Sequence, residues 1–203
     1  DINVVVNNAT GATLTMNAGT QFQTTVDDIG YNFVTISSTT ISPVDGVYTF
    51  SNLKIYEGTY VQYDYTYDSS DVDQRFLIPS DRADTTTIKC VIQNSASDTT
   101  QNTYTLATSI TELDGTSKVY FLQEVENGRF EVYFGDGVLG KAIADGNIVI
   151  LDYITCNRDA PNGATTFSLS GSIGGFSSAT ITTVSNASGG TGPESISSIK
   201  YNA

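Results

Sequence analysis

The chain has 203 residues, and its 39% apolar content is enough for one large β domain or two small ones with a buried core. The net charge of −13 comes from 22 acidic and 9 basic residues, and the basic ones are scattered singly. This pattern argues against binding to nucleic acid or an anionic membrane, because counterion release needs clustered Lys and Arg. No apolar run approaches the roughly 18 residues of a membrane span, so we expect a soluble piece of a longer protein.

Apolar and polar residues alternate with a period of two along the whole chain, which is typical of half-buried strands. The predicted strands are, in chain order, Val4–Val6, Leu14–Met16, Tyr31–Ile36, Val47–Leu53, Tyr60–Tyr67, Thr87–Ile92, Val119–Val125, Phe130–Phe134, Ile148–Ile154 and Thr180–Val184. No heptad, solenoid repeat or helical period longer than about three turns is present. We therefore predict an all-β fold, built as an antiparallel sandwich or barrel-like domain with a second, inserted β module.

Turn signals separate most of these strands. They are Asx-Gly pairs, which tolerate the positive φ that tight connections between antiparallel strands require. The pairs are Asp45-Gly46, Asp114-Gly115, Asn127-Gly128, Asp145-Gly146 and Asn162-Gly163. At Asn127 and Gly128 we predict a two-residue hairpin, with Glu126 and Arg129 facing each other across the turn. Two segments rich in Gly and Ser, 168–175 and 185–192, are expected to be mobile loops.

The complete lack of histidine argues against most enzymatic chemistry. A Ser-His-Asp or Cys-His arrangement cannot be built, and the commonest zinc ligand is missing. A glycosidase needs only two positioned carboxylates, but with 22 acidic residues on a solvated surface an arbitrary pair carries little information. We therefore expect neither an enzyme nor a bound cofactor, and we assign no catalytic residue.

The segment Gly135–Lys141 reads Gly-Asp-Gly-Val-Leu-Gly-Lys and matches the glycine spacing of a phosphate-binding loop. Such a site needs a helix whose N-terminus faces the phosphate. Here the predicted strand Ile148–Ile154 follows too soon for a helix. We therefore interpret Gly135, Asp136 and Gly137 as a tight turn or bulge that binds no nucleotide.

Metal binding is not expected. Asp68, Asp71 and Asp73 lie close together, but they lack the glycine and the terminal glutamate of a calcium-binding EF-hand loop, so a solvated acidic loop is favoured. Cys90 and Cys156 are too few for a disulfide scaffold and do not form a metal-binding pair. We favour two core thiols, and a single bridge stays open because it depends on whether the Cα atoms lie within about 7 Å.

Three tyrosines, Tyr63, Tyr65 and Tyr67, alternate with polar residues and so share one face of a predicted strand with Val61. A stripe of this kind is usually one wall of a core or a packed interface, and we take the three tyrosines as candidate interface residues. The alternative is a platform on which sugar rings stack.

A longer stretch of sequence resembles a known family. The run Tyr120–Lys141, which reads YFLQEVENGRFEVYFGDGVLGK, is followed by DGNIVILDY at 145–153, and together they resemble the baseplate wedge proteins of T-even-like and cyanobacterial contractile-tailed phages. Two flanking pieces, Asn17–Phe22 and Val184–Ser195, resemble the wider family of J-like baseplate proteins. The family's helical wedge-bundle portions have no counterpart in these 203 residues.

This resemblance implies a structural protein of the virion, located in the tail baseplate and assembled in the cytoplasm of the bacterial host. It would join neighbouring baseplate subunits into wedges and help to trigger contraction of the tail sheath. Its partners would be other baseplate wedge proteins, including further copies of itself, and the family brings no catalytic or metal-binding residues. The alternative function is a carbohydrate-binding or host-adhesin β module of a phage tail.

The resemblance also predicts a discontinuous architecture, because its early and late J-like pieces would ordinarily belong to one compact unit. We expect residues 1–61 and 158–203 to form a β base domain, with 62–157 inserted as a second β module of ordinary domain size. Insertions succeed where entry and exit points lie close together. Tyr60 should therefore lie near Asn157, and the first and last strands should be neighbours.

Overall fold

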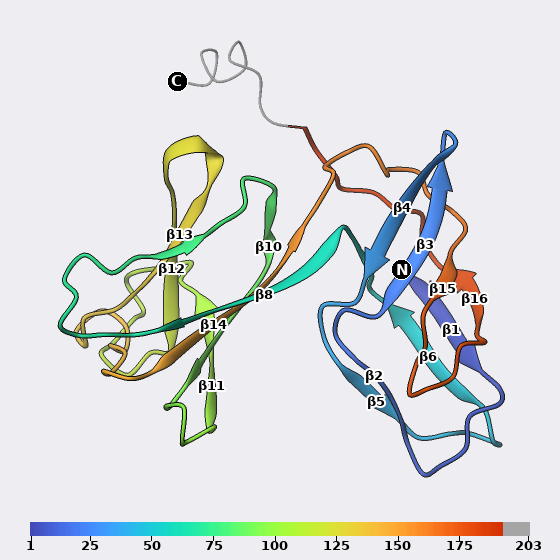
Figure 1. The fold of residues 1–203 in the computed structure, drawn as a ribbon, viewed down its shortest axis with the longest axis horizontal. Helices are drawn as coiled ribbons and strands as arrows, with labels where there is room; N and C mark the ends of the chain where they lie inside the picture. Colours follow the sequence, from blue (N-terminus) through green and yellow to red (C-terminus); the bar gives the residue numbers. More distant parts are fainter. Residues whose placement is uncertain (193–203) are drawn as a thin grey trace. The chain divides into compact units, whose positions relative to one another are not determined.

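The structure is a computed structural model that describes residues 1–192 (Figure 1). Within these residues the regular elements are sixteen β-strands and one three-residue 3-10 turn, η1 (Glu126–Gly128). The all-β class predicted from the period-two pattern is therefore confirmed. Residues Pro193–Ser195, at the end of the J-like flank, lie outside the described residues.

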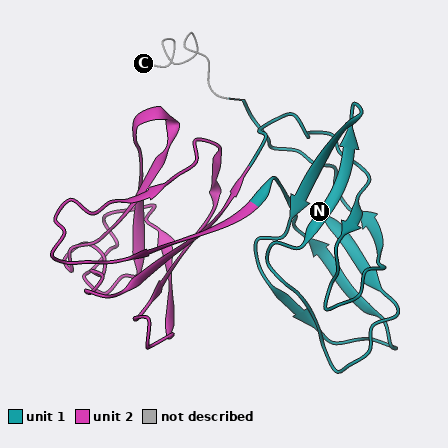
Figure 2. Ribbon diagram, viewed as in Figure 1, with its two compact units in different colours: residues 1–59, 156–203 teal, residues 60–155 magenta. Residues whose placement is uncertain are grey.

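The chain forms two compact units, coloured separately in Figure 2. Unit 1 consists of Asp1–Thr59 together with the chain from Cys156 onward, and unit 2 is Tyr60–Thr155. The chain therefore passes from unit 1 into unit 2 and back again. The predicted division at 61 and 157 places these two crossings slightly later in the sequence than 59 and 155.

Unit 1 contains three small sheets. The first has the order β16-β1-β6, with β1 (Ile2–Val6), β6 (Tyr48–Leu53) and β16 (Thr180–Thr183). The second has the order β15-β3-β4-β7, with β3 (Gln21–Val26), β4 (Ile29–Val34), β7 (Tyr56–Glu57) and β15 (Ser168–Ser170). The third pairs β2 (Leu14–Met16) with β5 (Thr39–Ile41).

The core of unit 1 follows from alternation along its strands. In β1, Ile2, Val4 and Val6 are fully buried, while the residues between them are half-buried. Phe22 of β3 and Phe50 of β6 are buried in the same core. Strand β1 is the central strand of its sheet and pairs antiparallel with both β6 and β16. The first described strand is thus a neighbour of the last, as predicted.

Unit 2 is built on one seven-stranded sheet with the order β8-β14-β10-β11-β12-β13-β9, which closes almost into a barrel. Its strands are β8 (Thr59–Thr66), β9 (Phe76–Ile78), β10 (Ala83–Gln93), β11 (Gln101–Leu106), β12 (Val119–Glu124), β13 (Phe130–Phe134) and β14 (Ile148–Thr155). Its core is lined by buried residues that include Ile78, Cys90, Val132 and Leu151.

One strand pair in unit 2 differs from a purely antiparallel arrangement. Strands β11 and β12 pair in parallel, with Thr105 opposite Val119 and Leu106 opposite Tyr120. A parallel pair needs a crossover of about a dozen residues or more, and the connection 107–118 has this length. Backbone hydrogen bonds join this connection to the Gly135–Lys141 segment.

The hairpin predicted at Asn127-Gly128 is present, but its loop is longer than predicted. Both residues have positive φ, 64° and 68°, as expected for a tight turn. The amide of Val125 donates a hydrogen bond of 2.8 Å to the carbonyl of Arg129, which leaves the three residues of η1 in the loop. The expectation that Glu126 faces Arg129 is therefore wrong, because Arg129 is opposite Val125 instead.

The two Gly- and Ser-rich segments carry more structure than expected. Strand β15 begins at Ser168 and pairs with β3, and Ile173 forms an isolated bridge with Phe176. The later segment is held by Asn162, whose amide group donates to the carbonyl of Gly190 (2.8 Å) and accepts from its amide (3.2 Å). The prediction of two plain mobile loops did not include these pairings.

Candidate functional site

The tyrosine stripe of β8 lies along the core of unit 2. Tyr65 and Tyr67 are half-buried and pack against this core, whereas Tyr63 is 42% exposed. The Tyr65 ring lies 5.0 Å from that of Tyr63 and 5.6 Å from that of Phe76, between ring centroids. Most of the aromatic surface of Tyr65 and Tyr67 is therefore already used within unit 2.

Side chains of β8 and its neighbours also join the two ends of the seven-stranded sheet. The Tyr65 hydroxyl donates a hydrogen bond to the carbonyl of Leu77 in β9, and the Gln74 side chain donates to the carbonyl of Thr66 (2.8 Å). Burial raises the pKa of the Tyr65 hydroxyl, so it stays protonated and remains a donor. These bonds take the place of ladder bonds between β8 and β9.

The segment Gly135–Lys141 forms a tight loop. The amide of Gly137 donates to the carbonyl of Gly140 (3.0 Å), and both glycines have positive φ. A Cβ atom on Gly135 would lie 2.3 Å from the carbonyl oxygens of Leu139 and Gly140, so only glycine fits there. No helix follows this loop within the described residues.

Asp136 uses the backbone amides that a phosphate would need. Its Oδ1 accepts hydrogen bonds from the amides of Val138 (2.9 Å) and Leu139 (3.1 Å). These bonds hold the pKa of the Asp136 carboxyl below its usual value, so the loop carries its own bound anion. A second anion at the same amides would be repelled, and the absence of nucleotide binding remains our prediction.

Two neighbouring loops of unit 2, 107–118 and 135–141, are joined into a feature that we call the double loop. The amide of Gly140 donates to the carbonyl of Asp114 (3.0 Å), and the amide of Lys141 donates to that of Ser117 (2.8 Å). Three large apolar side chains of the double loop are exposed: Ile110 by 63%, Val138 by 71% and Leu139 by 44%. The sequence reasoning took this region as turns and did not predict its exposed apolar side chains.

The acidic loop near Asp68 is organised by its own hydrogen bonds. Asp68 Oδ1 accepts from the amide of Ser70 (2.9 Å) and from its hydroxyl (2.6 Å), and Asp71 Oδ1 accepts from the amide of Asp73 (3.1 Å). Among residues 1–192 there is no group of three or more His, Cys, Asp or Glu residues arranged to hold a metal ion. The carboxylates act here as turn residues.

Both cysteines are free thiols. Cys90 is buried in the core of unit 2, and burial raises the pKa of its thiol to about 12. Cys156 belongs to unit 1 and is only half-buried. Cys90 therefore matches the predicted core thiol, whereas Cys156 lies nearer the surface than a core residue.

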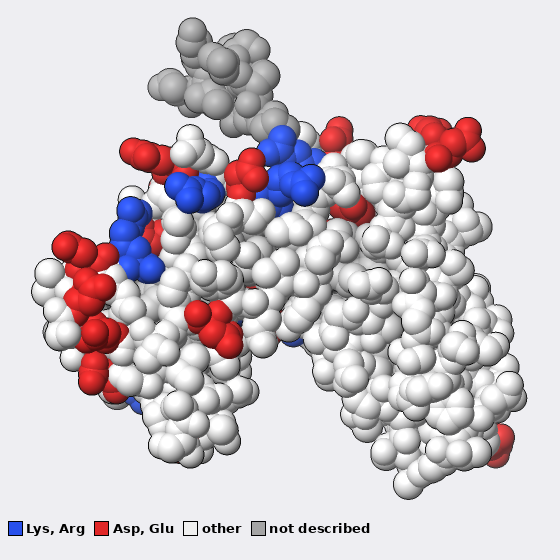
Figure 3. Space-filling view, viewed as in Figure 1, with Lys and Arg blue, Asp and Glu red and all other residues white. Residues whose placement is uncertain are grey.

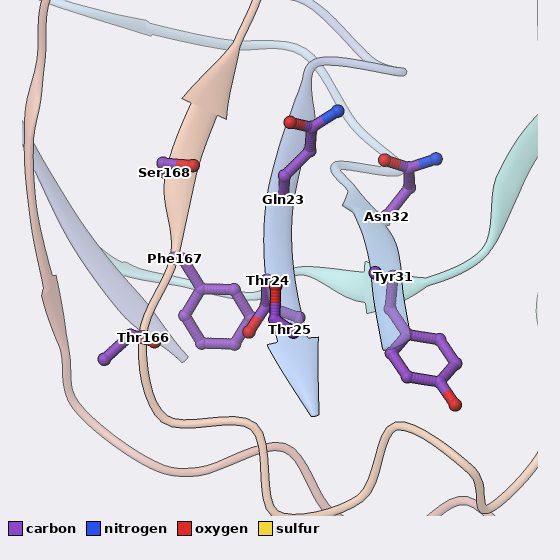
Figure 4. Close-up of a pocket in the computed structure, with 9 residues that line it drawn as sticks. Gln23, Thr24, Thr25, Tyr31, Asn32, Thr166, Phe167 and Ser168 are labelled. Atoms are coloured by element: carbon purple, nitrogen blue, oxygen red, sulfur yellow. The ribbon is translucent and has the colours of Figure 1, made fainter. Parts of the chain in front are cut away.

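Unit 1 contains a groove of about 620 Å³ that the sequence reasoning did not find (Figure 4). It lies along β3, β4 and the segment that leads into β15. Nine residues line it, and all of them are uncharged: Gln23, Thr24, Thr25, Gly30, Tyr31, Asn32, Thr166, Phe167 and Ser168. Its formation depends on strands from distant parts of the sequence, so no local motif reveals it.

On the face of the described chain that Figure 3 shows, the basic side chains form small groups and no extended basic surface. In Figure 3, Lys and Arg are scattered among Asp and Glu, and much of the visible surface is uncharged. The ion pair between Arg75 and Glu131 ties the segment before β9 to β13, and it lowers the pKa of Glu131. No helix in the described part of the chain is long and apolar enough to cross a membrane.

Comparison with known families connects unit 2 to a class of protein. The family model for the third domain of bacteriophage baseplate wedge protein gp6 matches residues 59–163. The chain belongs to this family. The match contains all of unit 2, so the wedge-family domain is the inserted unit, and the resemblance seen in Tyr120–Lys141 is confirmed. A comparison with curated proteins gave no match.

Family membership identifies the chain as a structural component of a phage tail baseplate. The family domain includes the tyrosine stripe and the double loop, whereas most of unit 1, with the polar groove, lies outside the match.

Proposed function

We propose that this chain is part of a wedge subunit that joins neighbouring baseplate proteins, including further copies of itself, and takes part in the trigger of sheath contraction. It acts as a passive assembly module in the virion, without catalysis and without contacts to nucleic acid or membrane. Its assembly into baseplates takes place in the cytoplasm of the bacterial host.

The observation that carries this proposal is the set of exposed apolar side chains on the double loop within the wedge-family domain. Ile110, Val138 and Leu139 are large apolar residues, and their loops are fixed by hydrogen bonds between the two segments. A loop that is already held by hydrogen bonds loses less conformational entropy when a protein partner covers it. We assign another baseplate wedge protein as the partner, because these side chains lie in the part of the chain that the family model matches.

The proposal is tested by replacing Val138 and Leu139 together with Ser and measuring binding to the other baseplate wedge proteins of the same phage. We expect at least about a tenfold loss of affinity, the scale of one interface hot spot. The matched control is Val72→Ser, because Val72 is 92% exposed in the same unit but lies outside the double loop. Equal binding by the double variant and the control would contradict the proposed contact.

A further inference from the structure

The chain contains two Asn-Gly pairs, Asn127-Gly128 and Asn162-Gly163, and the fold holds them in different ways. An asparagine before a glycine is prone to lose its side-chain amide, because no Cβ hinders the approach of the glycine nitrogen to the side-chain carbonyl. Both asparagines are exposed, and both glycines have positive φ, 68° at Gly128 and 90° at Gly163. The hydrogen bonds around the two pairs are what distinguishes them.

Asn162 is held at both of the groups that would react. Its side-chain amide donates to the carbonyl of Gly190 (2.8 Å), and its side-chain carbonyl accepts from the amide of Gly190 (3.2 Å). The amide of Gly163, which would be the nucleophile, donates to the carbonyl of Ala187 (2.8 Å). These three bonds must break before the Asn162 side chain can turn toward the Gly163 nitrogen, so the fold protects this site.

Asn127 lies in the η1 loop at the end of the β12–β13 hairpin, and its side chain is not held. The side-chain amide group forms no hydrogen bond within residues 1–192, and none of the three loop residues is buried. The bond from the amide of Val125 to the carbonyl of Arg129 (2.8 Å) closes the loop at its base and does not involve Asn127 or Gly128. Only a local opening of this exposed turn is needed to bring the Asn127 side chain to the Gly128 nitrogen.

We propose that Asn127 is a site of spontaneous covalent modification, at which the side-chain amide is lost without an enzyme. The Gly128 nitrogen gives up its proton and attacks the side-chain carbonyl carbon of Asn127. A C–N bond forms, the bond from that carbon to Nδ2 breaks, and Nδ2 leaves as ammonia with a proton. Water then opens the resulting succinimide ring at either carbonyl. Opening at the side-chain carbonyl gives an aspartyl residue, and opening at the main-chain carbonyl gives an isoaspartyl residue, whose backbone runs through the side chain.

The modification changes the hairpin that carries it. Either product adds a carboxylate beside the exposed Glu126, and the isoaspartyl product also lengthens the loop backbone by one carbon atom. Because loop length and turn geometry set the register of a hairpin, the longer loop should weaken the closing bond between Val125 and Arg129. The inference is independent of the wedge role, because that role rests on the double loop of unit 2.

The test incubates the whole 203-residue chain in a mildly alkaline buffer for several days and follows both sites by mass spectrometry after digestion with trypsin. Trypsin cuts after Lys118 and Arg129, so Asn127 is recovered in the peptide 119–129, apart from Asn162. Loss of the amide is read from the mass change of an NH₂ group replaced by OH, and the isoaspartyl product is detected with an isoaspartyl methyltransferase.

We expect amide loss at Asn127 to be at least about tenfold faster than at Asn162, because three hydrogen bonds restrain the second site. Both the aspartyl and the isoaspartyl product should appear at position 127. Equal rates at the two sites would overturn the proposal. Amide loss at position 127 without any isoaspartyl product would overturn the attack by the Gly128 nitrogen.

Two controls separate the effects of the fold and of the cyclisation. In guanidinium chloride the two rates should agree within about threefold, because no hydrogen bond of the folded state remains. A difference that stayed the same in the unfolded chain would overturn the protection by hydrogen bonds.

In the folded chain, Gly128→Ala should slow amide loss at Asn127 at least about tenfold, because the added Cβ hinders attack by the backbone nitrogen. This Cβ meets no atom within 4 Å, and the same holds for the matched control Gly163→Ala, which should leave the rate at Asn127 unchanged. An unchanged rate at Asn127 in Gly128→Ala would contradict the proposed reaction.

Discussion

Gly135 shows how a single residue determines the shape of the double loop. Its Cα faces the carbonyl oxygens of Leu139 and Gly140, and an added Cβ would lie 2.3 Å from each. Gly135→Ala must therefore push the loop apart, and we expect a loss of about 1–3 kcal/mol in the free energy of unfolding. This loss corresponds to a fall of roughly 4–8 °C in Tm per kcal/mol for a unit of this size. Thermal unfolding followed by circular dichroism measures it.

The matched control is Gly30→Ala. Gly30 does not have positive φ, and an added Cβ there meets no atom within 4 Å, so its effect should stay within about 0.5 kcal/mol. If both variants unfolded at the same temperature, the close approach of the backbone at Gly135 would not determine the stability of the loop, and the prediction would be wrong.

Among the turns, several carboxylates of unit 2 stabilise the folded state by accepting hydrogen bonds from their own loops. Asp114 Oδ1 accepts from the amide of Thr116 (2.8 Å) and from the hydroxyls of Thr116 (2.8 Å) and Ser117 (2.9 Å). These bonds lower the pKa of Asp114, and Asp98 and Asp136 have a lowered pKa for the same kind of reason. The charged form is favoured in the folded state.

The sign of the pH dependence follows from these shifts. A carboxyl whose pKa is lower in the folded state contributes stability above its unfolded pKa of about 3.9, and this contribution is lost as the pH falls through the folded value. We expect the Tm to fall as the pH is lowered from about 5 to about 2. The Tm of the Asp114→Asn variant should fall less over the same range, because the introduced amide does not titrate. The control Asp64→Asn changes an exposed carboxylate without a side-chain hydrogen bond in the described chain. Scanning calorimetry over this range that gave Asp114→Asn the same slope as the unchanged protein would contradict this assignment.

The elements that were predicted correctly have strong local signals. Asp45 and Gly46 both have positive φ and connect the bridge between Val44 and Val47, as expected of an Asx-Gly turn. The β3–β4 hairpin has no such pair. Its turn is Asp27-Asp28, and both residues adopt positive φ, which aspartate tolerates better than most residues.

Two of the strands that were missed, β3 and β11, have few buried apolar residues. In β11 only Tyr104 is buried, and in β3 one of the two buried residues is Thr24, so the alternation of apolar residues is weak. Burial of these strands comes from neighbours far away in the sequence. The polar groove depends on the same long-range register, which explains why local patterns predicted the turns but not the groove.

At the scale of the whole molecule, unit 1 is closed by contacts between its two separate halves. Strand β1 lies between β6 from the first half and β16 from the second. At the crossings, Asn157 donates from its amide to Glu57 Oε2 (2.7 Å) and from its side chain to Glu57 Oε1 (2.6 Å). The two chain ends that unit 2 connects are thus already close together within unit 1.

We therefore predict that unit 1 folds without unit 2. Deleting Tyr60–Thr155 and joining Thr59 to Cys156 through a linker of about four Gly and Ser residues should leave a soluble unit of about a hundred residues. The short linker costs little closure entropy, because the ends that it joins lie near each other. Denaturant unfolding should show a single cooperative transition.

The alternative is two consecutive domains, in which case the deletion would yield an unfolded chain while a cut near Asp73 would release two stable halves. The pairing of β1 with both β6 and β16 favours the deletion, because a cut near Asp73 would separate β16 from the sheet that it completes.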